Sequence, residues 1–284
     1  MVLPPHTLAK DIIETIRKNT YAMAKELKVK GLMNVQYAVK NNIVYVLEVN
    51  PRASRTVPFV SKAIGIPLAN LATKIMLGAT LKELGFTKEK NINYVAVKES
   101  VFPFIRFPGV DAVLGPEMKS TGEVMGIDST FAAAYLKSQI AAGQRLPTKG
   151  TVFISVKNQD KRNVVFIAKK LYDLGFKIMA TYGTALALKS SDIEVEVLPK
   201  LHEGRPNIID FIKDNKVSLI INTALGKSTK ADDMKIRSQA ILYNVPLITT
   251  LSGAQASVNG IENLIRKPGI TVKSIQEYHK KLKR

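Results

Sequence analysis

Thr151-Val152-Phe153-Ile154-Ser155-Val156 is the stretch that decides the fold of the second half of the chain. It is almost wholly apolar and rich in β-branched residues, which predicts a strand buried on both faces. Similar runs lie at 177–180, 194–198, 218–222 and 247–249, and helical patterns follow them at 161–173, 184–190, 207–215, 231–243 and 253–263. Because strands that alternate with helices over short loops form a parallel sheet covered on both faces, we expect a doubly wound α/β domain.

The first half of the chain has a different pattern of apolar residues. Apolar residues have helical spacing over 7–29, two alternating strands within 33–50 meet at Asn41-Asn42, and residues 58–84 are helix-like with breaks. A short strand at 94–97 and a helix at 129–142 are also predicted, whereas glycines and prolines interrupt residues 102–126. The polar segment 143–150 separates the two patterns of apolar residues, so we place a domain boundary between residues 1–145 and 146–284.

The composition limits the chemistry that the chain can perform. It has no cysteine, which excludes disulfides, thiolate metal sites and a cysteine nucleophile, and its three histidines are scattered. Any metal is therefore expected to bind oxygen ligands. No run of about 18 apolar residues is present, and the first residues lack the order of a secretory signal. We expect a cytoplasmic protein without a membrane partner.

A formal charge of +19 raises the question of nucleic acid binding. The excess is spread over the chain, with +8 in residues 1–145 and +11 in residues 146–284, and no DNA-binding or RNA-binding motif is found. The densest basic run, Lys280 to Arg284, is read as a solvated tail. Binding of small phosphorylated ligands explains the charge as well, and no nucleic acid partner is expected.

The predicted hairpin at 33–50 carries a polar face. A three-residue loop at 41–43 places Gln36 opposite Glu48 and Asn34 opposite Asn50. It turns Val35, Tyr37, Leu47 and Val49 to the other face, which is expected to belong to the core. A carboxylate and carboxamides on one rigid surface form a candidate Mg²⁺ site that needs phosphate oxygens and waters to complete it. Arg52 would add a cation for a phosphoryl group. A solvated sheet face is the alternative reading of the same residues.

A second group of polar residues falls at the ends of the predicted parallel strands. Thr181-Tyr182-Gly183-Thr184 follows one strand and opens a helix, so that free N–H groups and hydroxyls can face an anion. The other members of the group, also near strand ends, are Lys161, Lys200, Asn222 and Thr223. Together they suit one phosphate and its sugar. The alternative is that the Thr-Gly-Thr segment only caps a helix and the lysines are solvated.

Longer strings resemble the large subunit of carbamoyl phosphate synthetases. Glu48-Val49-Asn50-Pro51-Arg52, with its continuation to residue 63 and the string at 114–126, is similar to the end of the second ATP-grasp unit of that subunit. Residues 181–185, the string Lys200-x-His-Glu-Gly-Arg-Pro206 and the strand ending at Asn222-Thr223 look like its methylglyoxal-synthase-like regulatory domain. The resemblance covers nearly the whole chain.

The resemblance implies a fold and an activity. The fold is an incomplete ATP-grasp carboxyl-terminal lobe of α+β type over 1–145, followed by the regulatory domain over 146–284. The activity is that of an ATP-dependent ligase, which converts carbamate and ATP to carbamoyl phosphate and ADP for arginine and pyrimidine biosynthesis. Gln36, Glu48 and Asn50 match the residues that hold Mg²⁺ or Mn²⁺, and Arg52 matches the residue that contacts the phosphates or the carbamate.

The resemblance also implies partners, because the remaining ATP-grasp lobes are absent from the sequence. We expect the isolated chain to be inactive, and its partners to be the remainder of the large subunit and a glutaminase small subunit. In the regulatory domain, Lys161, Thr181, Gly183, Thr184, Lys200, Asn222 and Thr223 correspond to the effector site, for uridine monophosphate, inosine monophosphate or phosphoribosyl pyrophosphate. A hydroxyl common there is replaced by Ala224.

An ornithine site of some relatives matches Glu99, Phe102 and Thr249, but the aspartate of that site is Ile248 here. Three other functions stay open. The chain could be a stand-alone effector-binding module, a small lyase that releases methylglyoxal from a triose phosphate, or a nonspecific nucleic acid binder. Against the lyase, the place of its aspartate general base reads Asn222-Thr223.

Overall fold

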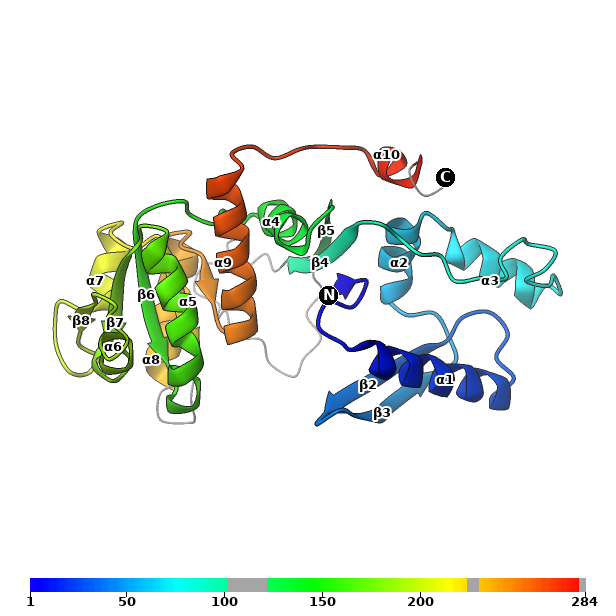
Figure 1. Cartoon of the computed structure of the whole chain (residues 1–284), viewed down its shortest axis with the longest axis horizontal. Coiled ribbons are helices and arrows are strands. Elements are labelled where there is room, and N and C mark those ends of the chain that lie inside the picture. Colours follow the sequence, from blue (N-terminus) through cyan, green and yellow to red (C-terminus); the bar gives the residue numbers. More distant parts are fainter. Residues whose placement is uncertain (102–121, 224–229, 281–284) are drawn as a thin grey trace. The chain divides into compact units, whose positions relative to one another are not determined.

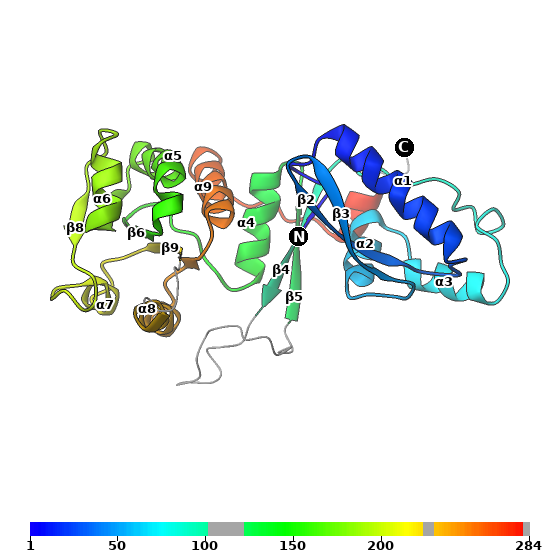
Figure 2. The ribbon, with the colours of Figure 1, turned by 90° about the horizontal axis from the view of Figure 1, so that it is seen from below.

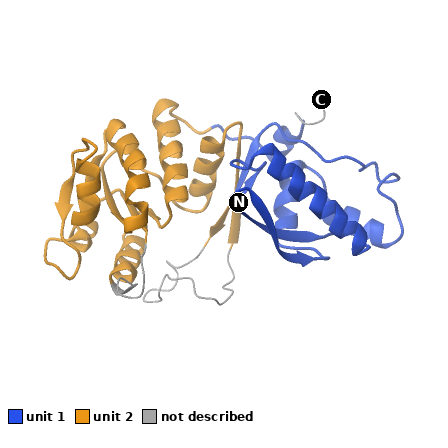
Figure 3. Ribbon diagram, turned by 60° about the horizontal axis from the view of Figure 1, so that its bottom comes forward, with its two compact units in different colours: residues 1–97, 271–284 blue, residues 98–270 orange. Residues whose placement is uncertain are grey.

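The computed structural model of the chain describes residues 1–101, 122–223 and 230–280. Phe102, Ala224, the greater part of the string 114–126 and the basic residues 281–284 lie outside the described residues. By the packing of its α-carbons the chain divides into two compact units, residues 1–97 with 271–284 and residues 98–270 (Figure 3). A domain boundary near residue 145 stays a prediction, since packing groups residues 98–145 with the second unit.

The second unit contains the predicted parallel sheet. Its strands are β6 (Thr151–Val156), β7 (Lys177–Thr181), β8 (Glu196–Leu198), β9 (Leu219–Thr223) and β10 (Leu247–Ile248), in the order β10-β9-β6-β7-β8. All four neighbouring pairs are parallel. The expectation of a doubly wound α/β domain is confirmed. The strand order brings the carboxyl ends of β9, β6 and β7 together at one edge of the sheet.

Helices cover both faces of this sheet. On one face lie α5 (Lys161–Asp173), α6 (Tyr182–Lys189) and α9 (Leu251–Arg266), and on the other lie α7 (Ile208–Lys213) and α8 (Lys230–Leu242) (Figures 1 and 2). Alternation along β6 fills two cores, because Val152 and Ile154 pack against the first group and Phe153 against the second. A short 3₁₀ turn, Asn158–Asp160, joins β6 to α5.

The second unit also holds a strand and a helix that precede the parallel sheet. Strand β5 (Gly122–Asp128) lies next to β4 (Val95–Val101), and α4 (Phe131–Ala141) packs on β5. The Thr130 hydroxyl caps α4 by accepting a hydrogen bond from the Ala133 N–H at 3.3 Å. The sequence did not indicate a strand at residues 122–128, because glycines interrupt the pattern there. Gly126 is the position at which α4 packs closely on β5.

The first unit consists of short elements around a hairpin. These are β1 (Val2–Leu3), α1 (Lys10–Glu26), β2 (Asn34–Lys40), β3 (Ile43–Asn50), α2 (Thr56–Ile64), α3 (Leu68–Met76) and α10 (Ile275–Lys280). β1 pairs antiparallel with the first residues of β4. α1 lies against the hairpin, where the hydroxyls of Thr20 and Tyr37 are 2.6 Å apart. None of the helices described here combines the length and the apolar composition that a membrane span requires.

The hairpin has the predicted register at its open end and a different turn at its tip. Gln36 pairs with Glu48 and Asn34 with Asn50, as expected. The expected three-residue loop is wrong, since Asn41 and Asn42, with φ of 52° and 61°, form a two-residue turn. A bulge between Gln36 and Tyr37 adds the missing residue to β3. Leu47, expected in the core, lies at this bulge and is 65% exposed.

Candidate functional site

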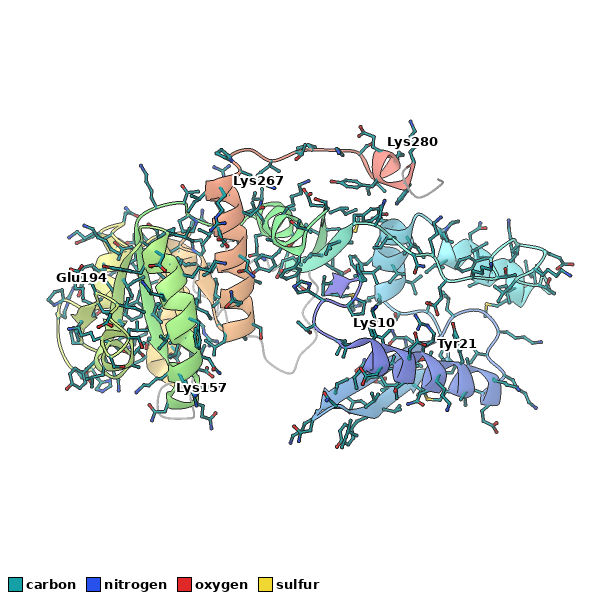
Figure 4. The ribbon with its side chains drawn as sticks, in the orientation of Figure 1. Lys10, Tyr21, Lys157, Glu194, Lys267 and Lys280 are labelled. Atoms are coloured by element: carbon teal, nitrogen blue, oxygen red, sulfur yellow. The ribbon has the colours of Figure 1, made fainter. Side chains whose placement is uncertain are left out.

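A cavity of about 410 Å³ lies at the carboxyl ends of the parallel strands. Figure 4 shows the Lys157 side chain at this edge, between the end of β6 and the start of α5. The cavity brings together all seven residues that the sequence analysis selected for this edge, from four separate segments. They are Lys161, Thr181, Gly183, Thr184, Lys200, Asn222 and Thr223.

Buried hydroxyls form a network at the floor of the cavity. Thr184, 1% exposed, accepts a hydrogen bond from the Val156 N–H at 3.2 Å, and Thr223, 6% exposed, accepts one from the Lys157 N–H at 3.1 Å. The Thr181 hydroxyl lies 3.2 Å from that of Ser155. A hydroxyl that accepts from the backbone keeps its own proton to donate. The floor therefore offers O–H donors to a ligand that only accepts hydrogen bonds, such as a phosphate.

The start of α6 adds backbone donors. Thr181 occupies the N-cap position, but its side chain makes no capping hydrogen bond within the described residues. The alternative reading of Thr-Gly-Thr as only a helix cap thus has no capping bond from the Thr181 side chain to support it. The first N–H groups of a helix have no partner inside the helix and attract anions. By contrast, α7 is closed by a capping box between Asn207 and Asp210.

The charged side chains of the described lining are three lysines and one aspartate. The lysines are Lys157, Lys161 and Lys200, and the aspartate is Asp233. Lys161 extends over the start of α6, because its Nζ would lie 2.8 Å from a Cβ atom at position 183. Lys200 is half-exposed and its Nζ lies 3.9 Å from Glu203. The cavity is thus net positive, which suits a phosphate ester.

Gly183→Ala is expected to weaken phosphate binding about three- to tenfold while leaving the unfolding temperature nearly unchanged. The new methyl group would displace the Lys161 ammonium, which can move because it is the flexible end of a side chain. The displaced ammonium would then no longer contact the bound anion. The measurement is calorimetric titration with uridine monophosphate. In a Lys161→Ala background the same glycine substitution should have no further effect. An equal loss in both backgrounds would contradict this explanation.

Several lining residues were missed by the sequence analysis. Asn158 and Gln159 belong to the polar turn directly after β6, and the position of that turn at a strand end was a usable signal. Asp233 lies on α8, and its Oδ1 accepts a hydrogen bond from the Asn222 Nδ2 at 2.9 Å. Nothing local in the sequence marks it, since only the strand order brings α8 to the end of β9.

The hairpin face carries the second group of predicted residues. The register brings Gln36, Glu48 and Asn50 together, and the Asn50 Nδ2 donates to the Glu48 Oε1 at 2.7 Å. The Arg52 Nη1 donates to the carbonyl oxygen of Ala53 in its own loop at 3.0 Å. One carboxylate and two carboxamides fit a hard cation only if other oxygens complete its shell. Across the described residues, no group of three or more His, Cys, Asp or Glu side chains could hold a metal.

A second pocket, of about 250 Å³, contains Glu99. The Gln139 Nε2 donates to the Glu99 Oε2 at 3.0 Å, and Arg145 and Leu247 also line the pocket. Burial raises the pKa of the Glu99 carboxyl, and the hydrogen bond from Gln139 partly offsets this. Of the residues that the resemblance grouped with Glu99, Thr249 is exposed and is not among those lining the pocket, and Phe102 lies outside the described residues.

Glu99→Gln is expected to raise the unfolding temperature at pH 7. Because the folded-state pKa lies above the unfolded value, the wild-type chain loses stability as pH rises through the unfolded pKa toward the folded one. The amide cannot ionise, so the advantage of the variant should vanish near pH 3. Thermal unfolding followed by circular dichroism at both pH values measures this, with Glu194→Gln, an exposed glutamate, as control. A variant that is less stable at pH 7 would contradict the burial argument.

Comparisons with known proteins match both groups of residues. The family described as "Carbamoyl-phosphate synthase L chain, ATP binding domain" matches residues 1–84, which include the hairpin. The family described as "MGS-like domain" matches residues 163–249, which include most of the cavity lining.

Curated relatives are similar over almost the whole chain. The carbamoyl phosphate synthase large chain of Methanothermobacter thermautotrophicus is 56% identical over 282 residues, which are 98% of this chain and 26% of the relative. A protein of the same description from Methanosarcina barkeri is 47% identical over 281 residues, 99% of this chain and 71% of the relative. The "C-terminal section" of the large chain of Methanocaldococcus jannaschii is 50% identical, over 99% of this chain and 47% of that section. The chain thus spans about a quarter of the length of the first of these relatives.

Proposed function

Because the chain belongs to the family of carbamoyl phosphate synthase large chains, we propose that it contributes to two sites of such an enzyme. Its parallel-sheet cavity binds a phosphorylated effector that regulates the enzyme. Its hairpin supplies one wall of the ATP-grasp site that phosphorylates carbamate. The isolated chain has no synthetase activity, since the other walls of that site belong to the remainder of the large chain.

The effector role is carried by one observation, the convergence of seven predicted residues on a single cavity. These residues offer hydroxyl donors, an uncapped helix start and lysines, and no described hydrophobic side chain other than Val156 lines the cavity. Such a lining selects a compact, strongly charged acceptor. The candidates are uridine monophosphate, inosine monophosphate and phosphoribosyl pyrophosphate, which all carry a ribose and a phosphate.

In the ATP-grasp wall, Gln36, Glu48 and Asn50 would hold Mg²⁺ or Mn²⁺, and Arg52 would neutralise charge on the phosphoryl group being transferred. The metal, when bound, supplies charge stabilisation of the transferring phosphoryl group. The Asn50 amide, which donates to Glu48, fixes the carboxylate as an acceptor for the cation. Arg52 has to leave the Ala53 carbonyl to reach a phosphate, which a side chain of this length can do.

The full enzyme would need the remainder of the large chain, and a glutaminase subunit to supply ammonia. An effector regulates such an enzyme only if it binds one conformational state more tightly than the other. A stand-alone binding module is the alternative function, and it would bind the same effectors. Adding the effector to the reassembled large chain separates the two, because only a regulatory domain changes the rate of carbamoyl phosphate formation.

The test of the effector role is calorimetric titration of the chain with the three candidate effectors, repeated on Lys200→Ala. We expect saturable one-site binding that this substitution weakens about tenfold through the loss of a charge-assisted hydrogen bond. Lys216→Ala is the matched control, because Lys216 is also exposed and paired but does not line the cavity. No binding of any candidate, or equal effects of both substitutions, would contradict the proposal.

The same preparation discriminates two further functions. A nonspecific nucleic acid binder would lose affinity steeply with salt and show no preference for a mononucleotide. A lyase would release methylglyoxal from dihydroxyacetone phosphate, and we expect no release. The assay is needed because Asp233 brings a carboxylate into the cavity, so the absence of an aspartate at Asn222-Thr223 does not by itself exclude elimination.

A further inference from the structure

Asp233 is the one acidic side chain in the described lining of a cavity that otherwise suits an anion. A carboxylate beside a bound phosphate would repel it. Its position is nevertheless well defined, because its Oδ1 accepts a hydrogen bond from Asn222, which is itself 3% exposed at the end of β9. Within the part of the chain that the structure describes, this is the hydrogen bond that Asp233 makes. A carboxylate has about four acceptor positions, so several remain for a ligand.

The strand order separates this carboxylate from the anion-binding end of the cavity. Thr181 and Gly183 follow β7, whereas Asn222 ends β9, and β6 lies between the two strands. Neighbouring strands are about 4.8 Å apart, so the ends of β7 and β9 are roughly 10 Å apart. The Lys161 ammonium lies at the β7 end, over Gly183. A ligand can therefore place its phosphate near β7 and a different group near Asp233.

The group near Asp233 must donate hydrogen bonds and carry no negative charge, since an ionised carboxylate only accepts. Sugar hydroxyls meet both requirements. We propose that Asp233 accepts hydrogen bonds from the sugar hydroxyls of the effector, and so selects a ribose phosphate over inorganic phosphate or a deoxyribose phosphate. This inference rests on the proposed function, because it takes the cavity to be a phosphate-ester site.

A structural role alone does not account for the position of Asp233. Asp232 and Asp233 both lie in the first turn of α8, where a negative charge stabilises the helix. Asp232, however, pairs with the Nδ1 of His202 at 3.0 Å and does not line the cavity. The two successive carboxylates thus lie in the same turn of α8 and differ in what they face, which makes Asp232 the matched control.

The test is calorimetric titration of the chain with uridine and inosine monophosphates, with their 2′-deoxy counterparts and with inorganic phosphate. The wild-type chain should bind the ribonucleotide more tightly than its 2′-deoxy form. Asp233→Asn, which can still accept from Asn222, should bind the ribonucleotide about tenfold more weakly and lose the preference over the deoxy form. It should bind inorganic phosphate at least as tightly as before, and Asp232→Asn should leave every ratio unchanged.

The outcomes separate the two levels of the proposal. No saturable binding of any nucleotide to the wild-type chain would overturn the proposed function and this inference with it. Nucleotide binding without a preference for the ribose form in the wild-type chain would overturn the inference alone. So would an Asp233→Asn variant that weakens nucleotides and inorganic phosphate by the same factor. The preference is measured on the wild-type chain, so that result stands even if the variant folds poorly.

Discussion

Replacing Gly126 by alanine is expected to destabilise the second unit by about 3 kcal/mol, the cost of severe overpacking. A Cβ atom at this position would fall far inside van der Waals contact of the Ala134 carbonyl oxygen and 2.5 Å from the Ser138 nitrogen. Both are backbone atoms of α4, which cannot rotate away as a side chain can. The helix would have to move off β5. It would then withdraw Leu136 from the core that α5, α6 and α9 form on one face of the parallel sheet. Urea unfolding followed by far-ultraviolet circular dichroism measures the change.

Gly122→Ala is the matched control for this prediction, because both glycines lie in β5. A Cβ atom at position 122 would meet the Val101 side chain at 3.6 Å, which is an ordinary contact. We expect its free energy of unfolding to stay within about 0.5 kcal/mol of the wild-type value, or to rise slightly because alanine suits a strand better than glycine. Equal stability of the two variants would mean that α4 does not pack on β5 as closely as described.

Lys161→Ala is expected to weaken effector binding by about 10- to 100-fold, the effect of losing a charge-assisted hydrogen bond to a phosphate. The Nζ of this lysine extends over the start of α6, where the uncapped N–H groups would also face the anion. The fold should be intact, since Lys161 begins a helix and alanine is a good helix former. Calorimetric titration with uridine monophosphate gives the dissociation constants.

Lys169→Ala controls for the loss of a positive charge from the same helix. Lys169 is exposed and pairs with Asp173, away from the cavity. Its removal should change the affinity less than twofold, because exposed charges beyond a Debye length of about 8 Å are largely screened at physiological salt. If both variants bound the effector equally weakly, binding would depend on overall charge and not on the cavity.

The parallel sheet was predictable from sequence because its strands are apolar on both faces. Phe153 and Ile154 pack into different cores, so the run carries no polar alternation that could suggest an exposed sheet. The predicted limits of α5, residues 161–173, agree with the structure. β5 was missed because Gly122 and Gly126 break its pattern. The close approach of α4, which requires a glycine at position 126, is a tertiary contact that no local pattern contains.

The hairpin shows how a correct register can follow from an incorrect turn. The pairing of Gln36 with Glu48 was expected from a three-residue loop, and it results from a two-residue turn and a bulge. Both arrangements insert one extra residue before Glu48, in the loop in the expected case and at the bulge of β3 in the observed one. The alternation of side chains across the bulge could not be predicted, so Leu47 was placed in the core and is exposed.

The candidate cavity was predictable in part, because its residues follow strand ends. Thr181 and Thr223 could be chosen from the sequence since a parallel sheet collects its carboxyl ends at one edge. Asp233 could not, because α8 reaches the cavity only through the strand order, in which β9 is a neighbour of β6. The residue that distinguishes a sugar phosphate from a phosphate in our proposal is therefore one that only the structure supplies.

The most direct test of the central claim is a crystal structure of the chain grown with saturating uridine or inosine monophosphate. We expect density for the phosphate at the start of α6, within hydrogen-bond distance of the Lys161 Nζ and of the N–H groups of Gly183 and Thr184. We also expect the ribose next to Asp233. Nucleotide bound elsewhere on the chain with this cavity empty, or with its phosphate beside Asp233, would contradict the account.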